Sequence, residues 1–156
     1  MNVVIANRQR VKKIDTRLLK KFVAALLAEL EIGEAELGIN LVGARAMALV
    51  NETFLQHEGS TDVITFNHDE KANPKKIHGE LFICVDDAVA QAKEFKTSWQ
   101  SEIVRYIVHG VLHLLGYDDL KPHLRREMKR EENWLVRRLA RKFSLAQIGV
   151  KPRISP

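Results

Sequence analysis

The chain has 156 residues, of which 46% are hydrophobic, with a formal net charge of +5 and one cysteine. This length predicts one domain, and no apolar run reaches the roughly 20 residues of a membrane-spanning helix. The amino-terminus lacks the basic segment and long apolar stretch of a signal peptide. Because Cys84 has no second cysteine to pair with, the expected compartment is a reducing cytoplasm.

Apolar periodicity and turn signals predict nine elements in the order β-α-β-α-β-β-α-α-α. Predicted strands cover residues 3–6, 37–42, 62–66 and 79–85. Predicted helices end at residues 30, 54, 95, 115 and 143, and their start signals are Asp15 or Thr16, Gly43, Asp86 or Asp87, Ser98 and Pro122. This order indicates the α+β class: a small mixed sheet of about four strands with several helices packed on it. The domain is expected to span residues 1–147, and residues 148–156 are expected to form a mobile basic tail.

Positive charge is concentrated at the carboxyl-terminal end. Residues 120–156 carry a formal charge of +8, whereas residues 1–119 carry −3. A basic segment beside an acidic body suggests a polyanionic partner, nucleic acid before membrane. The alternative is a solvated helix face on which glutamates pair with arginines, as the sequence Arg130-Glu131-Glu132 suggests.

The most informative motif is His109-Gly-Val-Leu-His113, followed by Gly116, Asp118 and Asp119. The two histidines lie inside an apolar run that predicts a central buried helix, and side chains at i and i+4 share one helix face. Gly116 can end the helix in a left-handed conformation and turn the carboxylates towards the histidines. Two histidines, a carboxylate and an open position describe a catalytic zinc-type site.

Two other interpretations compete with this one. The spacing matches the ligand spacing of metzincin proteases, but those enzymes need a glutamate after the first histidine, where this chain has Gly110. A protease is therefore the least favoured function. Structural histidines in a helix core are the second alternative, and they explain neither the helix stop nor the two carboxylates that follow.

With this histidine motif, the sequence resembles the YbeY family of bacterial metal-dependent endoribonucleases, which act in ribosomal RNA maturation. The histidine segment is similar to the family's His-Gly-x-Leu-His-Leu-x-Gly-Tyr-Asp-His. Residues 60–66, Ser-Thr-Asp-Val-Ile-Thr-Phe, and residues 79–85, Gly-Glu-Leu-Phe-Ile-Cys-Val, are similar to two further family blocks, with Asn51 and Phe54 upstream in register. The resemblance covers roughly residues 1–145.

Two positions depart from the family pattern. The third metal ligand of the family is a histidine, and Asp119 stands there; His123 is the alternative third ligand. A carboxylate is a normal zinc ligand, although its negative charge should acidify bound water less than a histidine would. The family also has an arginine where this chain has Leu55, which cannot contact phosphate; His57, Lys75, Lys76 and Arg125 are candidate substitutes.

The resemblance implies a single-strand-specific endoribonuclease of ribosomal RNA processing and ribosome quality control, with one divalent metal ion, zinc by default. Its ligands would be His109, His113 and Asp119, with Asp118 orienting a ligand or holding the turn. Thr61 and Asp62 are candidate catalytic residues, and Asp62 could equally fix the turn before a strand. RNA contacts are predicted for Arg125, Arg126, Lys129 and Arg130. Expected partners are ribosomal RNA or a ribosomal subunit, and possible ones are ribosome-associated proteins; the alternative function is a ribosome assembly or RNA-binding factor with a structural or weakly active metal site.

Overall fold

The computed structural model describes residues 1–55, 61–69 and 71–150. Its elements follow one another in the predicted order, β-α-β-α-β-β-α-α-α. The strands are β1 (Asn2–Asn7), β2 (Glu34–Val42), β3 (Val63–Asn67) and β4 (Lys76–Cys84). The helices are α1 (Thr16–Glu29), α2 (Ala44–Phe54), α3 (Val85–Phe95), α4 (Trp99–Leu114) and α5 (Pro122–Lys142), followed by a short 3-10 helix, Leu145–Ile148.

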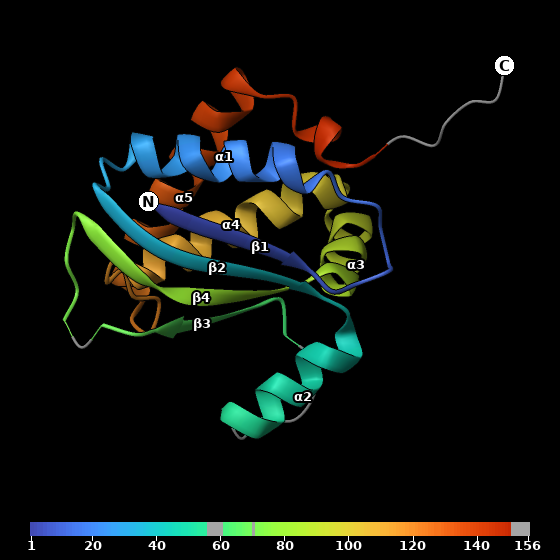
Figure 1. Ribbon diagram of the computed structural model, residues 1–156, viewed down its shortest axis with the longest axis horizontal. Coiled ribbons are helices and arrows are strands. Elements are labelled where there is room, and N and C mark those ends of the chain that lie inside the picture. Colours follow the sequence, from blue (N-terminus) through green and yellow to red (C-terminus); the bar gives the residue numbers. More distant parts are fainter. Residues whose placement is uncertain (56–60, 70, 151–156) are drawn as a thin grey trace, which may run out of the picture.

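The four strands form one mixed sheet in the order β1-β2-β4-β3. Strands β1, β2 and β4 are parallel, whereas β3 pairs antiparallel with β4. Helices α1, α3, α4 and α5 lie on one side of this sheet, and α2 lies on the other side (Figure 1). The predicted α+β class, with a small mixed sheet and helices packed on it, is confirmed.

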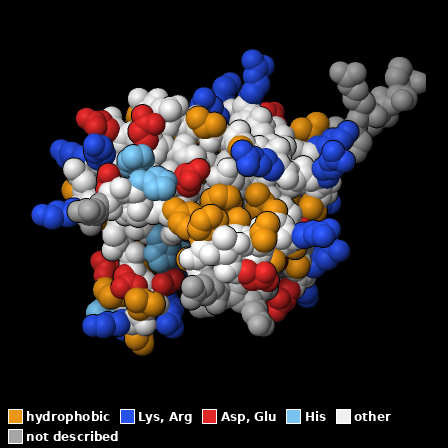
Figure 2. All heavy atoms as spheres, turned by 60° about the horizontal axis from the view of Figure 1, so that its bottom comes forward, with side chains coloured by type: hydrophobic (Ala, Val, Ile, Leu, Met, Phe, Trp, Pro, Cys, Tyr) orange, Lys and Arg blue, Asp and Glu red, His pale blue; other side chains and the backbone are white. Residues whose placement is uncertain are grey.

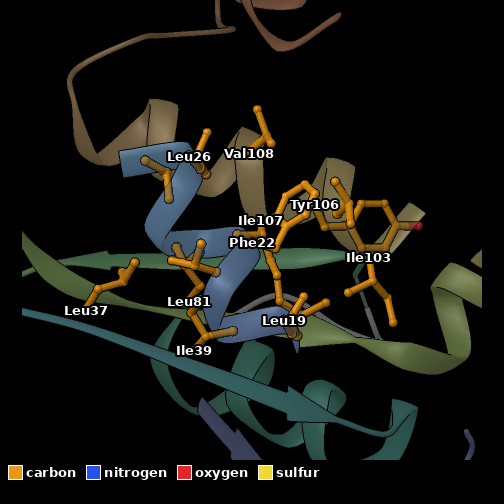
Figure 3. Packing of buried hydrophobic residues seen from close by; sticks show 14 of the residues in the cluster. Leu19, Phe22, Leu26, Leu37, Ile39, Leu81, Ile103, Tyr106, Ile107 and Val108 are labelled. Carbon is orange, nitrogen blue, oxygen red and sulfur yellow. The ribbon is translucent and has the colours of Figure 1, made fainter. Parts of the chain in front are cut away.

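The main core lies between the sheet and the helices α1 and α4, and α5 also contributes buried side chains to it (Figure 3). Alternate residues of β2 and β4 point into it, including Leu37, Ile39 and Leu81, because side chains of a strand alternate between its faces. Helix α4 is buried on nearly all sides, as its apolar sequence predicts. It is therefore the central helix on which the two histidines are held.

The close approach of α4 to the sheet depends on Gly110. A Cβ atom at this position would lie 2.7 Å from Cδ2 of Leu81 on β4, which is closer than real Cβ contacts. Glycine lets the two backbones approach. Position 110 therefore faces the core, and the missing side chain has a packing reason.

Several helix starts agree with the sequence. Asp15 caps α1 through Leu18 N–H, and Ser98 caps α4 through Ser101 N–H. The predicted cap of α3 was wrong, because the residue preceding that helix is Cys84. Asp86 instead accepts a hydrogen bond of 2.6 Å from Ala44 N–H and so caps α2 from outside that helix. A sequence pattern that considers only neighbouring residues does not find such a long-range cap.

Several segments extend beyond their predicted bounds, and β2 begins at Glu34 where residue 37 was predicted. Strand β4 begins at Lys76, so residues 76–78, predicted as loop, pair with the first residues of β2. Ile148, predicted as part of a mobile tail, is only 1% exposed, and its carbonyl accepts a hydrogen bond from Asp15 N–H. Gly149 forms a β-bridge with Ile14. An apolar side chain with a place in the core therefore holds residues 148–149 against the domain.

The side of the sheet opposite α4 is only partly covered by α2. Val4 of β1 and Leu49 and Phe54 of α2 are exposed hydrophobic residues. Figure 2 shows hydrophobic side chains gathered in the middle of the face below the sheet of Figure 1, with most lysines and arginines around it. No helix in the described part of the chain is both long and apolar enough to cross a membrane.

Candidate metal centre

Three side chains meet where α4 ends. Nε2 of His109 lies 3.1 Å from Nε2 of His113, and one carboxylate oxygen of Asp119 lies 3.7 Å and 3.5 Å from these two atoms. These three residues form a group that could hold a metal ion. Ligands about 2.0–2.1 Å from a tetrahedral zinc ion lie about 3.3–3.4 Å from one another. The three separations bracket this value, so the donor set fits one divalent cation.

The outer nitrogens of both imidazoles have acceptors as partners. Nδ1 of His109 lies 2.8 Å from a carboxylate oxygen of Glu132, and Nδ1 of His113 lies 3.1 Å from the carbonyl oxygen of Tyr117. A neutral imidazole therefore carries its proton on Nδ1 in both residues. Two Nε2 lone pairs then face each other across 3.1 Å, with a carboxylate oxygen beside them. Three acceptors at one point repel one another unless a cation lies between them.

Glu132 of α5 supports this arrangement from inside the protein. It is 2% exposed, and its carboxylate accepts hydrogen bonds from Arg105, Lys129 and His109 at 2.7, 2.9 and 2.8 Å. Burial raises the pKa of this carboxyl, but the hydrogen bonds from His109, Lys129 and Arg105 outweigh burial and lower the pKa to about 2. An ionised carboxylate behind an imidazole fixes its tautomer and its orientation.

Sequence analysis missed this role of Glu132. The sequence Arg130-Glu131-Glu132 predicts only that Glu132 pairs with arginines on its own helix. A usable signal was present, because Glu132 falls on the apolar stripe that Met128, Leu135, Val136 and Leu139 form on α5. A glutamate on a buried helix stripe needs a partner, and the partner is His109 on another helix.

A Schellman turn brings Asp119 back to the histidines. Gly116 has φ of +100°, and its N–H donates to the carbonyl of His113, while Tyr117 N–H donates to the carbonyl of Leu112. The left-handed stop predicted at Gly116 is thereby confirmed. Beyond it, the Asp118 carboxylate accepts a hydrogen bond from Leu120 N–H, and Nε of Arg125 donates to the carbonyl of Asp119.

A cleft of about 420 Å³ opens beside His109 between β3, α3, α4 and α5. Two of its wall residues are Asp62 and Lys129, both singled out from the sequence. The Asp62 carboxylate accepts hydrogen bonds from Val63 N–H at 2.8 Å and from the Thr61 hydroxyl at 3.5 Å. Asp62 therefore holds the chain at the start of β3 while it also lines the cleft.

The remaining predicted residues lie around the centre or away from it. His123, Arg126 and Arg130 are exposed on α5, and His123 is not in the histidine–aspartate group. Lys76 contacts Glu34 at 3.9 Å.

Leu55 ends α2 on the other side of the sheet and is 40% exposed (Figure 1). His57 lies outside the described residues. Among the candidate cations that could replace an arginine at position 55, Arg125 contacts the loop that carries Asp119, through its hydrogen bond to the Asp119 carbonyl.

An α+β domain in which two histidines and a carboxylate meet, with an open cleft beside one of the histidines, is the arrangement of a metal-dependent hydrolase. Residues 4–140 match the family model described as Endoribonuclease YbeY. The chain is 33% identical to Endoribonuclease YbeY of Chlorobium luteolum, over 90% of this chain and all of that protein. It is 35% identical to Endoribonuclease YbeY of Chlorobium phaeovibrioides, over 88% of this chain and 90% of that one. The chain therefore belongs to the YbeY endoribonuclease family.

A solved structure supports the fold. The solution structure of a Thermotoga maritima protein matches with a TM-score of 0.68 and 24% sequence identity, covering 90% of this chain and 91% of that one. The shared architecture extends over nearly the whole domain.

Proposed function

We propose that this chain cleaves single-stranded ribosomal RNA during ribosomal RNA maturation, with one zinc ion bound by His109, His113 and Asp119. Family membership supports RNA hydrolysis. The observation that carries the metal is the pair of Nε2 atoms 3.1 Å apart, both left as acceptors by their outer hydrogen bonds. Zinc is the default ion for two imidazoles and a carboxylate. The proposed setting is a ribosomal subunit in the cytoplasm, where the enzyme also contributes to ribosome quality control.

The protein's own groups have distinct proposed roles. Glu132 keeps the His109 proton on Nδ1, which leaves Nε2 free for the ion. Asp62 is the carboxylate proposed to take a proton in the cleft, and Thr61 helps to hold it. Arg125, Arg126, Lys129 and Arg130 supply phosphate contacts, which position RNA without reading its sequence. A bound divalent cation would polarise a phosphoryl oxygen and acidify water.

The experiment measures metal content of the purified protein together with cleavage of a single-stranded ribosomal RNA fragment, with and without chelator. We expect one metal ion per chain and chelator-sensitive cleavage. His113→Ala should lose both, because two donors hold zinc poorly. Asp62→Asn should keep the metal and lose most cleavage.

His123→Ala is the matched control, since it removes an exposed histidine close in sequence that lies outside the proposed ligand set. It should keep both metal and cleavage. Loss of metal in His123→Ala would show that His123, and not Asp119, is the third ligand. If the protein without substitutions binds metal but does not cleave RNA, the alternative function is favoured, which is a ribosome assembly or RNA-binding factor. Leu55 and Asp119, the two departures from the family pattern, are the reason for this alternative. Absence of metal would contradict the proposal.

A further inference from the structure

Arg105 lies one helical turn before His109 on α4, and His113 lies one turn after it. The three residues are spaced by four, so they follow one face of the helix, about 6 Å apart along its axis. Neighbouring phosphates of an extended single strand have a similar separation. A strand with one phosphate at the histidines therefore brings the next phosphate towards Arg105.

The guanidinium of Arg105 keeps unused donors. Nη1 donates to Glu132 and to Asn133, both at 2.7 Å, whereas Nε and Nη2 donate to no residue in the described part of the chain. Arginine has five N–H groups, so three of them have no protein partner there. The side chain is 30% exposed and lines the cleft beside His109. It is a cation fixed in place at one edge with its other edge free.

Charged side chains of both signs line this cleft. Arg105 and Lys129 share the single carboxylate of Glu132, so two cations meet one anion in this group of side chains. The carboxylates of Asp62 and Glu102 lie near Tyr106, where they add to burial in raising the pKa of its hydroxyl. The cleft thus offers both cationic donors and carboxylate acceptors.

The remaining wall contains flat apolar surface. Phe95, at the end of α3, is 62% exposed, and Val63 also lines the cleft. Single-stranded RNA is bound mainly through bases that leave the stack and contact aromatic side chains. A nucleotide has a phosphate anion for the cationic donors, base faces for the apolar side chains and base N–H groups for the carboxylate acceptors.

We propose that this cleft binds the nucleotide next to the cleaved linkage, with Arg105 contacting its phosphate and Phe95 contacting its base. This inference rests on the proposed endoribonuclease function and adds a substrate-binding position to it. Arg105 here contacts substrate directly, in addition to its contact with Glu132.

The test measures binding of a fluorescein-labelled 2′-O-methyl RNA decamer to the metal-loaded protein by anisotropy across a range of salt concentrations. Each lost phosphate contact lowers the slope of log affinity against log salt by about 0.7 for a single strand. Arg105→Gln should show this decrease and keep its metal, because Lys129 and His109 still hold Glu132. Phe95→Ala should weaken binding roughly 5- to 150-fold and leave the slope unchanged, as expected for a lost stacking contact. Arg17→Gln, an exposed arginine on α1, is the control that should match the unchanged protein.

Three outcomes would overturn the inference while leaving the proposed function intact: an unchanged slope in Arg105→Gln, loss of metal in that variant, or unchanged affinity in Phe95→Ala. The second outcome would mean that Arg105 acts only through Glu132. If the protein without any substitution neither binds the decamer nor cleaves ribosomal RNA, both the proposed function and this inference are overturned.

Discussion

The Glu132 carboxylate joins three donors from two helices at one buried point. Arg105 and His109 reach it from α4, and Lys129 reaches it from the preceding turn of α5. A buried carboxylate is costly to desolvate, and these hydrogen bonds compensate for that cost. The residue therefore connects the packing of α4 on α5 with the orientation of a proposed metal ligand.

Glu132→Gln should weaken metal binding by about 10- to 100-fold, the usual effect of losing the carboxylate behind a ligating histidine. The amide keeps the shape of the side chain but removes the negative charge that favours the Nδ1 proton of His109. Competition with a fluorescent zinc chelator measures the dissociation constant. Glu131→Gln, a neighbouring glutamate outside this network, is the control. Equal affinity in both variants would show that the carboxylate does not act on the metal.

At the scale of elements, the contact of α4 with β4 sets the depth of the proposed metal ligands in the protein. The backbones approach closely because Gly110 has no side chain, and Leu81 fills the space beneath it. Side chains on the opposite face of α4 are left to meet α5 and the cleft. Both the contact between α4 and β4 and the position of the candidate metal centre thus depend on Gly110.

Gly110→Ala should lower the free energy of unfolding. Overpacking costs roughly 1–3 kcal/mol, whereas alanine gains about 1 kcal/mol over glycine in a helix interior. A net loss of about 1 kcal/mol is expected in urea unfolding. A Leu81→Ala background removes the three atoms nearest to the new methyl group, so the same substitution should become stabilising there. Equal effects in the two backgrounds would contradict the proposed clash.

At the scale of the whole molecule, an ion-pair cluster joins the outer helices. Arg138 and Lys142 of α5 contact Glu29 at the end of α1, at 3.2 and 2.7 Å. Hydrogen bonds from Lys142 and then Arg138 lower the pKa of Glu29. Part of the basic charge in residues 120–156 is therefore neutralised within the fold, by a glutamate of another helix. The alternative interpretation of the charge asymmetry expected glutamates and arginines of the same helix face to pair, as in Arg130-Glu131-Glu132.

Stability should respond to pH through Glu29. A carboxyl whose pKa is lower in the folded state stabilises the fold above its unfolded pKa, and this contribution is lost as pH falls through the folded pKa. Glu29→Gln should therefore lower Tm at pH 6 but have less effect at pH 3. High salt should reduce the difference at pH 6, since the pairs are close to solvent. Thermal unfolding of the two proteins checks this, and an effect equal at both pH values would exclude the ion pairs as its cause.

Local sequence signals were sufficient for most of the fold. Helical spacing, the caps at Asp15 and Ser98 and the stop at Gly116 act within a few residues, so the order of elements and the turn that returns Asp119 were predictable. The spacing of His109 and His113 likewise places both on one helix face before any tertiary contact is known.

Long-range contacts decided the rest. Asp86 caps α2 across 42 positions of sequence, and Glu132 meets His109 across 23. Ile148 returns to the core because a place for it exists between elements distant in the chain. The sequence by itself determined which residues form helices, strands and turns, because those preferences depend on near neighbours. Only the tertiary structure decided which buried charge meets which imidazole and where the cleft opens, because these depend on how α4, α5 and the sheet pack together.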